Sequence, residues 1–368
     1  MKWNWQHRDW PHFRCRAEEL GQYEKLFWEK AGVSFGALKY FDAEQKTSLI
    51  VDMMEVEAFR SSEIEGEILN RESLQSSIRA HFGLKTGIKR VPPAERGMAE
   101  MMVSVYQTWD EPLTHEMLYS WHKMVVNGRH DLDTVGAYRT HDGAMEIVSG
   151  PIHAPKIHFE APPSAKVPGE MNHYVTWFNG FRGDEHGNPL IRAGLAHLYF
   201  ESIHPFEDGN GRIGRAIAEK ALSQSIGRPT LIAIANTIGS RKKDYYDALQ
   251  KGSYGMDATE WLHYFAQTVL AAQDYTQAMI DFLISKGRFF LRFADRINPR
   301  QEKVLHKMFS AGMEGFKGGL SADNYILMTK TSRATATRDL NALVEMGALT
   351  KTGVLRHSRY WLKLPQSG

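Results

Sequence analysis

Hydrophobic residues recur at helical spacing over most of this chain, which predicts a mainly α-helical protein. The apolar stretch 191–203 predicts a buried helix that ends at His204, because Pro205 disfavours helical backbone in the residue before it. A second apolar-periodic segment, from about 212 to 226, predicts the next helix. A polar turn that contains glycine therefore lies between two core helices.

The N-terminal part of the chain also predicts helices. Apolar residues within 53–59 fit a helix that runs into 60–66, where Gly66 can take the C-terminal position. Ser61 and Glu65 are four residues apart and so lie on one face of that helix. The first 80 or so residues, which hold four tryptophans, form a predicted helical module in which the aromatic side chains belong to the core.

The last part of the chain predicts three helices followed by a two-stranded hairpin. The third helix begins after the N-cap signal at Ser332, and Gly347 closes it. The expected helices are 301–312, 320–327 and 333–346, and the expected strands are 349–352 and 359–362.

A further hairpin is expected within 144–159, around a turn at Ser149-Gly150-Pro151. The expected fold class is thus mainly α, with two small β elements. The expected domains are an N-terminal helical module at 1–90, a helical core at 91–285 and a C-terminal domain at 286–368.

Composition narrows the protein class. The 368 residues are 42% hydrophobic, enough for two or three domains with buried cores, and the single cysteine, Cys15, excludes a disulfide framework. A signal-peptide pattern and a run of about 18 apolar residues are both missing, so a cytoplasmic protein without membrane spans is expected. The net charge of +2 is uneven, because residues 286–368 hold 15 Lys and Arg against 6 Asp and Glu. This basic excess leaves DNA binding, dimerisation and target docking open for that region.

Residues 204–215 concentrate groups that can handle a nucleoside triphosphate. Gly209 and Gly211 can take positive φ angles and expose backbone N–H groups, which makes a cradle for an anion at the start of the following helix. Arg212 and Arg215 are three residues apart and share a face of its first turn. The cluster therefore predicts a phosphate site.

Two further residues of the cluster predict chemistry at that site. Asp208 can hold a magnesium ion against phosphate oxygens, and His204 can take a proton from an attacking hydroxyl. The glycines also match a dinucleotide fingerprint, but the preceding segment is helical and an acidic residue is missing at the required spacing. The chain lacks a P-loop sequence, and its histidines lack zinc-site spacing.

The string HPFEDGNGRIGR at 204–215 resembles the signature HxFx(D/E)GNGRxxR of the Fic (filamentation induced by cAMP) family at every defined position. Fic enzymes mostly transfer AMP from ATP to a hydroxyl side chain of a target protein and release pyrophosphate. The resemblance implies that His204 is the catalytic base, Phe206 anchors the loop and Asp208 binds magnesium. The implied nucleotide-binding residues are Phe206, Glu207, Asp208, Gly209, Asn210, Gly211, Arg212 and Arg215.

Residues 61–66 also fit (S/T)xxxE(G/N), the motif of the Fic inhibitory helix, with Ser61, Glu65 and Gly66 at the defined positions. Read from its residues alone, the segment is a helical turn with surface carboxylates. In the family, the glutamate pairs with the second signature arginine, here Arg215, and occupies the space that the γ-phosphate needs. The resemblance thus implies autoinhibition by a helix that precedes the catalytic motif.

Weaker similarities add to the resemblance. Residues 136–140 are similar to the segment that enters the Fic flap, a hairpin that can pair with an extended target segment. Tyr246 resembles an adenine-side tyrosine, although Ser253 stands where some relatives have asparagine. The order of elements at 286–368 resembles a winged helix-turn-helix. The residues expected on its outer face are Arg333, Thr335, Thr337 and Arg338 of the recognition helix, and Arg356 and Arg359 of the wing.

The function expected from the sequence is that of an autoinhibited protein adenylyltransferase, which uses ATP and magnesium to modify a Ser, Thr or Tyr of a target protein or of itself. Transfer of another group, hydrolytic removal of AMP with Glu65 positioning water, and a nucleotide-sensing DNA-binding regulator are alternatives. DNA is a candidate partner of residues 286–368, and a homodimer is a candidate assembly.

Overall fold

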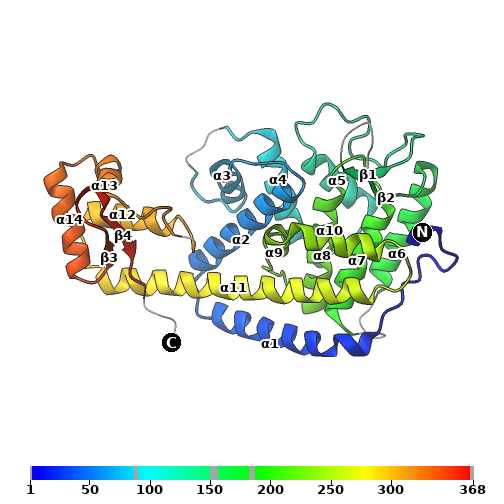
Figure 1. Ribbon diagram of the computed structural model, residues 1–368, viewed down its shortest axis with the longest axis horizontal. Coiled ribbons are helices and arrows are strands. Elements are labelled where there is room, and N and C mark those ends of the chain that lie inside the picture. Colours follow the sequence, from blue (N-terminus) through cyan, green and yellow to red (C-terminus); the bar gives the residue numbers. More distant parts are fainter. Residues whose placement is uncertain (1, 87–89, 150–155, 182–186, 314, 365–368) are drawn as a thin grey trace. The chain divides into compact units, whose positions relative to one another are not determined.

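The computed structural model describes residues 2–86, 90–149, 156–181, 187–313 and 315–364. They form two compact units, residues 1–276 and 277–368 (Figure 1). The helices of the first unit are α1 (Gly21–Leu38), α2 (Ala43–Ile64), α3 (Arg71–His81), α4 (Pro93–Gln107), α5 (His115–Val125), α6 (Val167–Gly180), α7 (Pro189–Ile203), α8 (Asn210–Ile226), α9 (Ile234–Ser240) and α10 (Lys242–Gly252). Helix α11 (Thr259–Phe293) begins in the first unit and ends in the second.

The prediction of a mainly α-helical fold is confirmed: strands of the described residues occur in only two small antiparallel hairpins. Among the described residues, none of the helices has both the length and the apolar character needed to cross a bilayer. The predicted boundary at 285 lies inside α11, and the compact first unit combines the first two predicted domains. The division into three domains stays a prediction.

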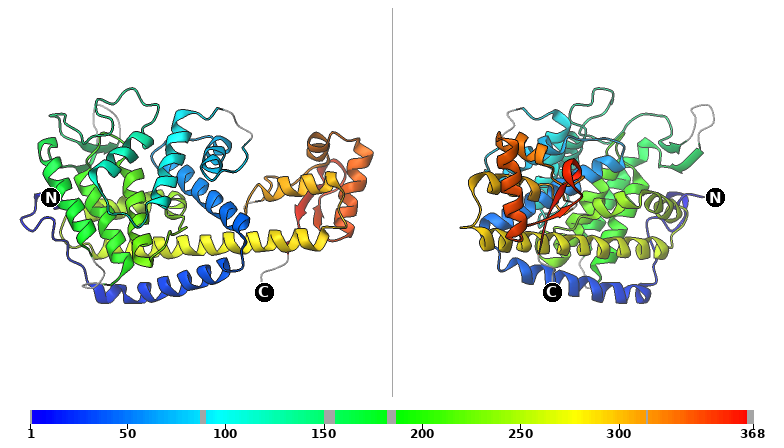
Figure 2. Two further views of the ribbon diagram at one scale, coloured as in Figure 1. Left: turned by 180° about the vertical axis from the view of Figure 1, so that it is seen from behind. Right: turned by 60° about the vertical axis from the view of Figure 1, so that its left-hand side comes forward.

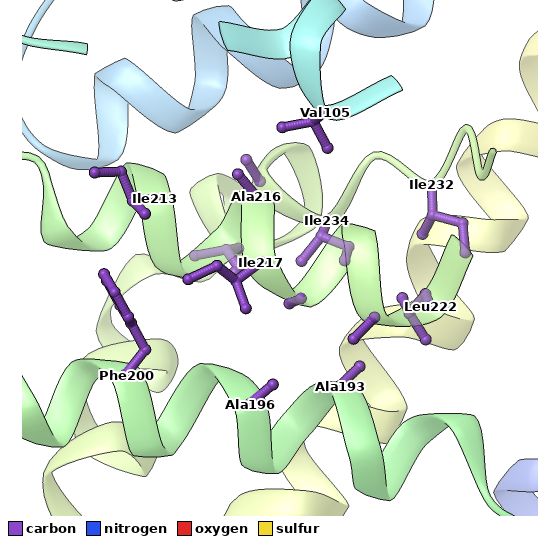
Figure 3. Packing of buried hydrophobic residues seen from close by; sticks show 14 of the residues in the cluster. Val105, Ala193, Ala196, Phe200, Ile213, Ala216, Ile217, Leu222, Ile232 and Ile234 are labelled. Carbon is purple, nitrogen blue, oxygen red and sulfur yellow. The ribbon is translucent and has the colours of Figure 1, made fainter. Parts of the chain in front are cut away.

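Helices α7 and α8 lie side by side at the core of the first unit (Figure 1). Every residue of α7 is buried, and small residues along it let neighbouring helices approach closely. The N-terminus of α7 is capped by Asn188, whose side chain accepts the N–H of Leu190 at 2.9 Å. Figure 3 shows the side chains that pack between the two helices: Ala193, Ala196 and Phe200 from α7, and Ile213, Ile217 and Leu222 from α8.

The N-terminal residues belong to the same core. The Trp3 ring stacks on Tyr254 with centroids 4.9 Å apart, and the buried Asn4 donates to the Ser202 hydroxyl at 2.6 Å. Helix α1 runs along the first part of α11 in both views (Figures 1 and 2), where Gln273 donates to the carbonyl of Phe27 at 3.1 Å. Trp3 is packed in this way but only half-buried, and Trp28 on α1 is 41% exposed. The prediction that the N-terminal tryptophans belong to the core is therefore wrong for Trp28.

Helix α2 brings the predicted inhibitory segment to α8. Asp42 caps its N-terminus in a capping box with Gln45. The helix ends at Ile64, and Gly66 follows with a φ of 86°, a left-handed conformation that glycine adopts readily. The buried Glu57 accepts the N–H of Ala235 at 2.8 Å, which ties the middle of α2 to the start of α9.

A small hairpin of strands β1 (Glu146–Ser149) and β2 (Lys156–Glu160) corresponds to the predicted flap. Its register is irregular between Ile147 and Val148. The predicted turn at 149–151 falls largely outside the described residues. Trp5 donates from its indole N–H to the carbonyl of Glu160 at 2.7 Å, which fixes the base of the hairpin to the N-terminal segment.

The second unit has the predicted order of three helices and a hairpin. Its elements after α11 are α12 (Pro299–Phe309), α13 (Ala322–Thr329), α14 (Arg333–Glu345), β3 (Leu349–Thr352) and β4 (Arg359–Leu362). The second helix begins two residues later than predicted, because Ser321 caps it by accepting the N–H of Asn324 at 3.1 Å. The first helix is also shifted, from 301–312 to Pro299–Phe309, since Asn298 caps its start. Assignment to the winged helix-turn-helix fold stays a prediction.

Candidate active site

His204 follows the last residue of α7 in a left-handed conformation, with φ 50° and ψ 61°. Its N–H still donates to the carbonyl of Phe200 at 3.0 Å, so the chain leaves the helix directly after His204. The buried Arg139 donates from Nε to the carbonyl of His204 at 2.9 Å and from Nη1 to the Ser164 hydroxyl at 2.8 Å. This arginine comes from the predicted 136–140 segment and fixes a backbone conformation that non-glycine residues seldom adopt.

Phe206 packs in the core at the turn after His204. Its ring is fully buried, stacked on His122 with centroids 4.2 Å apart, and tilted against Tyr138 at 5.4 Å. Burial lowers the pKa of His122 to about 4, so the imidazole is neutral at pH 7 and can stack on an apolar ring. His122 Nδ1 accepts the N–H of Gly136 at 2.9 Å.

Asn210 closes the loop with its side chain. Its Oδ1 accepts the N–H of Phe206 at 2.9 Å, and its Nδ2 donates to the carbonyl of the same residue at 2.8 Å. Its amide is thereby used to hold the loop, and only its backbone N–H is left for the predicted anion cradle. Glu207, also in the predicted set, accepts the N–H of Asp133 at 3.0 Å and so joins the loop to the segment after α5.

The residues of the predicted anion cradle lie at the N-terminus of α8. Gly209 precedes the helix with a φ of 83°, and the helix begins at Asn210, two residues earlier than predicted. The first N–H groups of such a helix lack carbonyl partners within it and carry the positive end of its dipole. Arg212 and Arg215 are both buried, and their atoms Arg212 Nε and Arg215 Nη1 lack hydrogen-bond partners among the described residues. Unsatisfied buried donors beside a helix N-terminus fit an anionic ligand.

Glu65 and Ser61 bind Arg215 together. Arg215 Nη2 lies 2.8 Å from Glu65 Oε1, and Arg215 Nε donates to the Ser61 hydroxyl at 2.9 Å. Burial acts to lower the pKa of Arg215, but Glu65, Tyr245 and Glu201 together outweigh it and the net shift is upward. A Cβ on Gly211 would lie 2.2 Å from Glu65 Oε1, so the carboxylate rests directly on the backbone of the first turn of α8. The predicted pairing of Glu65 with Arg215 is thus present in the structure.

Two residues that the sequence did not single out engage the rest of the site. Glu67 Oε2 pairs with Arg212 Nη1 at 2.5 Å, and Arg129 Nη1 pairs with Asp208 Oδ2 at 2.5 Å. Arg212 Nη2 also lies 3.2 Å from Asp208 Oδ1. Burial acts to raise the pKa of Asp208, but Arg212 and Arg129 outweigh it and lower the pKa. Both signature arginines are therefore paired with carboxylates that follow α2 directly.

A pocket of about 400 Å³ lies between the flap hairpin, the end of α7 and α10. Tyr246 lines it, and its hydroxyl donates to the carbonyl of Ile64 at 3.4 Å, next to Glu65. Gln250 and Ser253 line the same wall, and Gln250 donates to the carbonyl of His158 on the flap at 3.2 Å. The structure thus places Tyr246 between this pocket and the end of α2.

Comparison with known proteins agrees with this geometry. Residues 112–222 match the family model described as Fic/DOC family. The chain carries a Fic domain. Residues 3–84 match a domain of unknown function, DUF4172, which covers the segment that brings Glu65 to the site.

Two proteins named protein adenylyltransferase Fic are similar to part of the chain. The chain is 28% identical over 145 residues to a protein adenylyltransferase Fic of Nematostella vectensis, covering 39% of this chain and 30% of the relative. It is 33% identical over 85 residues to a protein of the same name from Aedes aegypti, covering 23% and 16%. The chain thus spans less than a third of the length of these relatives.

Solved structures support the fold. A crystal structure of a Fic family protein from Desulfovibrio desulfuricans superposes with a TM-score of 0.52 at 20% identity, covering 94% of this chain and 97% of that one. At this identity the likeness concerns the fold. It extends beyond the Fic domain to nearly the whole chain.

Asn210→Ala tests how the loop of the Fic domain is held. The variant leaves the N–H and the carbonyl of the buried Phe206 without partners, at a cost of about 1–3 kcal/mol for each group. We expect a lower unfolding temperature and faster hydrogen exchange at the Phe206 amide. Asn172→Ala, on the exposed side of α6, is the matched control. Equal exchange rates at Phe206 in both variants would contradict the role of Asn210.

Proposed function

We propose that this chain is a protein adenylyltransferase, which transfers AMP from ATP to a hydroxyl side chain of a target protein. The observation that carries the proposal is the pair of buried arginines at the N-terminus of α8, whose unpartnered donors suit the phosphates of a nucleotide. His204 stands at the start of the same loop as a base for the target hydroxyl. The names of the Nematostella and Aedes relatives support this activity.

In the proposed reaction, the O–H bond of a target Ser, Thr or Tyr breaks and its proton passes to His204. The hydroxyl oxygen bonds to the α-phosphorus, and pyrophosphate leaves with the electrons of the broken P–O bond. Arg212, Arg215 and the N–H groups of Asn210 and Gly211 stabilise the negative charge, whereas the Gly209 N–H donates to the Asp208 carboxylate. The flap offers the exposed apolar pair Val148 and Ile157, against which an extended target segment can lie.

Asp208 is the residue that would hold magnesium. Its side chain is 32% exposed and supplies one carboxylate, which fits the way Mg²⁺ binds through one or two carboxylates together with substrate phosphates. When bound, the ion would neutralise phosphate charge. Arg129 and Arg212 compensate the Asp208 carboxylate in the present structure, so the ion would replace part of their interaction.

Glu65 is the proposed inhibitory residue. Its carboxylate lies against the backbone of Gly211 and binds Arg215. A terminal phosphate bound beside Gly211 would compete with Glu65 for the same donors. Tyr246 and its pocket are the proposed site of the base. The phosphate contacts do not distinguish one nucleotide base from another. Use of a donor other than ATP and hydrolytic removal of AMP from a modified protein are therefore other outcomes of the test below. Self-modification and a homodimer stay predictions.

Label transfer from α-labelled ATP with magnesium tests the activity. We expect Glu65→Gly to raise labelling of protein by about 10–100-fold, since it removes a charge-assisted pair worth about 1.5–3 kcal/mol. Glu63→Gly is the matched control, because Glu63 pairs with Arg60 and not with the site. His204→Ala in the Glu65→Gly chain should abolish labelling. A chain that binds ATP and labels nothing in any variant, with lysate present, would contradict adenylyl transfer.

Glu67→Gln tests whether the second carboxylate also restrains the site. In the Glu65→Gly chain, freeing Arg212 should lower the Kd for ATP by roughly two- to fivefold, because Glu67 is partly exposed and its ion pair is screened. Calorimetry would measure the Kd. Glu72→Gln, an exposed glutamate five residues later, is the control. Equal Kd values for ATP in Glu65→Gly, Glu65→Gly/Glu67→Gln and Glu65→Gly/Glu72→Gln would show that Glu67 does not restrain the site.

A DNA-binding regulator is the second candidate function, and one observation favours it. Helix α14 buries Leu340 and Leu343 and exposes Arg333, Thr337 and Arg338, which suit phosphate contacts. Arg333 pairs with Asp323, which leaves Arg338 as the more available cation.

Mobility shifts with duplex DNA at several salt concentrations test this candidate. Arg338→Ala should weaken binding and reduce the salt slope by about 1, whereas Lys303→Ala, on an exposed position of α12, should change neither. Binding should persist in His204→Ala. A chain that does not shift DNA at low salt would exclude this function.

A further inference from the structure

Glu201 lies one helical turn before His204, on the completely buried helix α7. Its side chain is 6% exposed, and its Oε2 lies 3.5 Å from Nδ1 of His204. This separation is longer than a strong hydrogen bond. Among the described residues, His204 Nδ1 and Glu201 Oε1 have no hydrogen-bond partner. The Glu201 carboxylate thus lies next to Nδ1 of the predicted base, and no other described group donates a hydrogen bond to its Oε1.

The position of Glu201 is built by its neighbours. A Cβ on Gly214 would lie 2.5 Å from Glu201 Oε1 and 3.1 Å from His197 Nδ1, so only a glycine on α8 leaves room for the carboxylate. His197 is itself fixed by its Nε2, which lies 2.9 Å from the Tyr245 hydroxyl. Backbone of two helices and a second imidazole therefore hold Glu201 beside His204.

The charge on Glu201 is retained in spite of this burial. Burial acts to raise the pKa of Glu201, but His204, His197 and Arg215 outweigh it and the net shift is downward. Without such partners, a buried carboxylate would be protonated. An apolar residue could then replace it at little cost in stability. The arrangement favours a carboxylate that acts on His204.

We propose that Glu201 is the positioning residue of His204: it accepts the Nδ1 proton and thereby leaves Nε2 free to take the proton of the target hydroxyl. This inference rests on the proposed function. A neutral imidazole carries its proton on one nitrogen only, so binding Nδ1–H selects the tautomer with a basic Nε2. The 3.5 Å contact shortens when the imidazole becomes positively charged, as hydrogen bonds of catalytic groups often do only in the reacting complex.

The tautomer of His204 can be measured without any catalysis. In the full chain labelled with ¹⁵N-histidine, at a pH of about 9 where imidazoles are neutral, the long-range ¹⁵N–¹H spectrum separates the Nδ1–H and Nε2–H forms. The signals of His204 are those that vanish in His204→Ala. We expect the Nδ1–H form in the wild-type chain and a loss of that preference in Glu201→Leu. An Nε2–H form in the wild-type chain would overturn the proposal.

Kinetics of label transfer add a second readout in the Glu65→Gly chain. Glu201→Gln keeps an acceptor but loses the charge, so kcat should fall by about 10–100-fold, a larger change than any in the Kd for ATP. Glu57→Gln is the matched control, because Glu57 is buried to the same 6% exposure but accepts the N–H of Ala235. An unchanged kcat in Glu201→Gln would overturn the proposal, as would an equal fall in Glu57→Gln.

The tautomer measurement tests the role of Glu201 without any catalysis, whereas label transfer also requires the proposed function to be right. If Glu65→Gly transfers no label and His204 is in the Nδ1–H form, adenylyl transfer is wrong and the positioning role stands. If Glu201→Leu does not fold, the wild-type tautomer and Glu201→Gln decide the case.

Discussion

The buried charge of Arg215 is the constraint around which the first unit is arranged. Its side chain is 2% exposed, and a guanidinium in such a place is costly unless carboxylates and hydrogen-bond acceptors compensate it. Ser61 on α2 and Glu65 directly after it supply that compensation. They precede Arg215 in the chain by 154 and 150 residues. The end of α2 is therefore held on the first turn of α8 by the same charge that would hold a phosphate.

This shared charge gives autoinhibition a simple physical basis in the proposed function. A carboxylate and a phosphate are alternative partners of one guanidinium, so whichever is present lowers the cost of burying it. The unpartnered Nη1 of Arg215 shows that Glu65 and Ser61 do not satisfy every donor. A ligand with more oxygens than one carboxylate can satisfy more of them.

Close backbone approach makes these contacts possible. Gly211 and Gly214 lie in the first turns of α8, and a Cβ on either would meet a carboxylate oxygen within 2.5 Å, at Glu65 in the first case and Glu201 in the second. The helix thus presents bare backbone on two sides. One side receives Glu65, and the other receives Glu201 beside His204.

Local chemistry in the sequence determined much of this protein. The apolar periodicity predicted α7 and α8, and Pro205 predicted where α7 ends, because these depend on residues close in the chain. The strands 349–352 and 359–362 were predicted at their observed bounds, whereas helix starts shifted by about two residues where Asn298 and Ser321 cap them. The resemblance of 204–215 and 61–66 to Fic motifs predicted the pairing of Glu65 with Arg215.

Only the tertiary structure decided which other charges reach the site. Glu67 and Arg212 are 145 residues apart, and Arg129 and Asp208 are 79 apart, so no local pattern joins them. Glu201 is close to His204 in sequence, but the apolar pattern of its helix does not indicate a role for the carboxylate. Its position beside His204 depends on Gly214 and His197, which enclose it in the folded protein. Periodicity encodes which face of a helix is buried. The partner of a buried charge depends on how distant segments pack, and that is set by the fold.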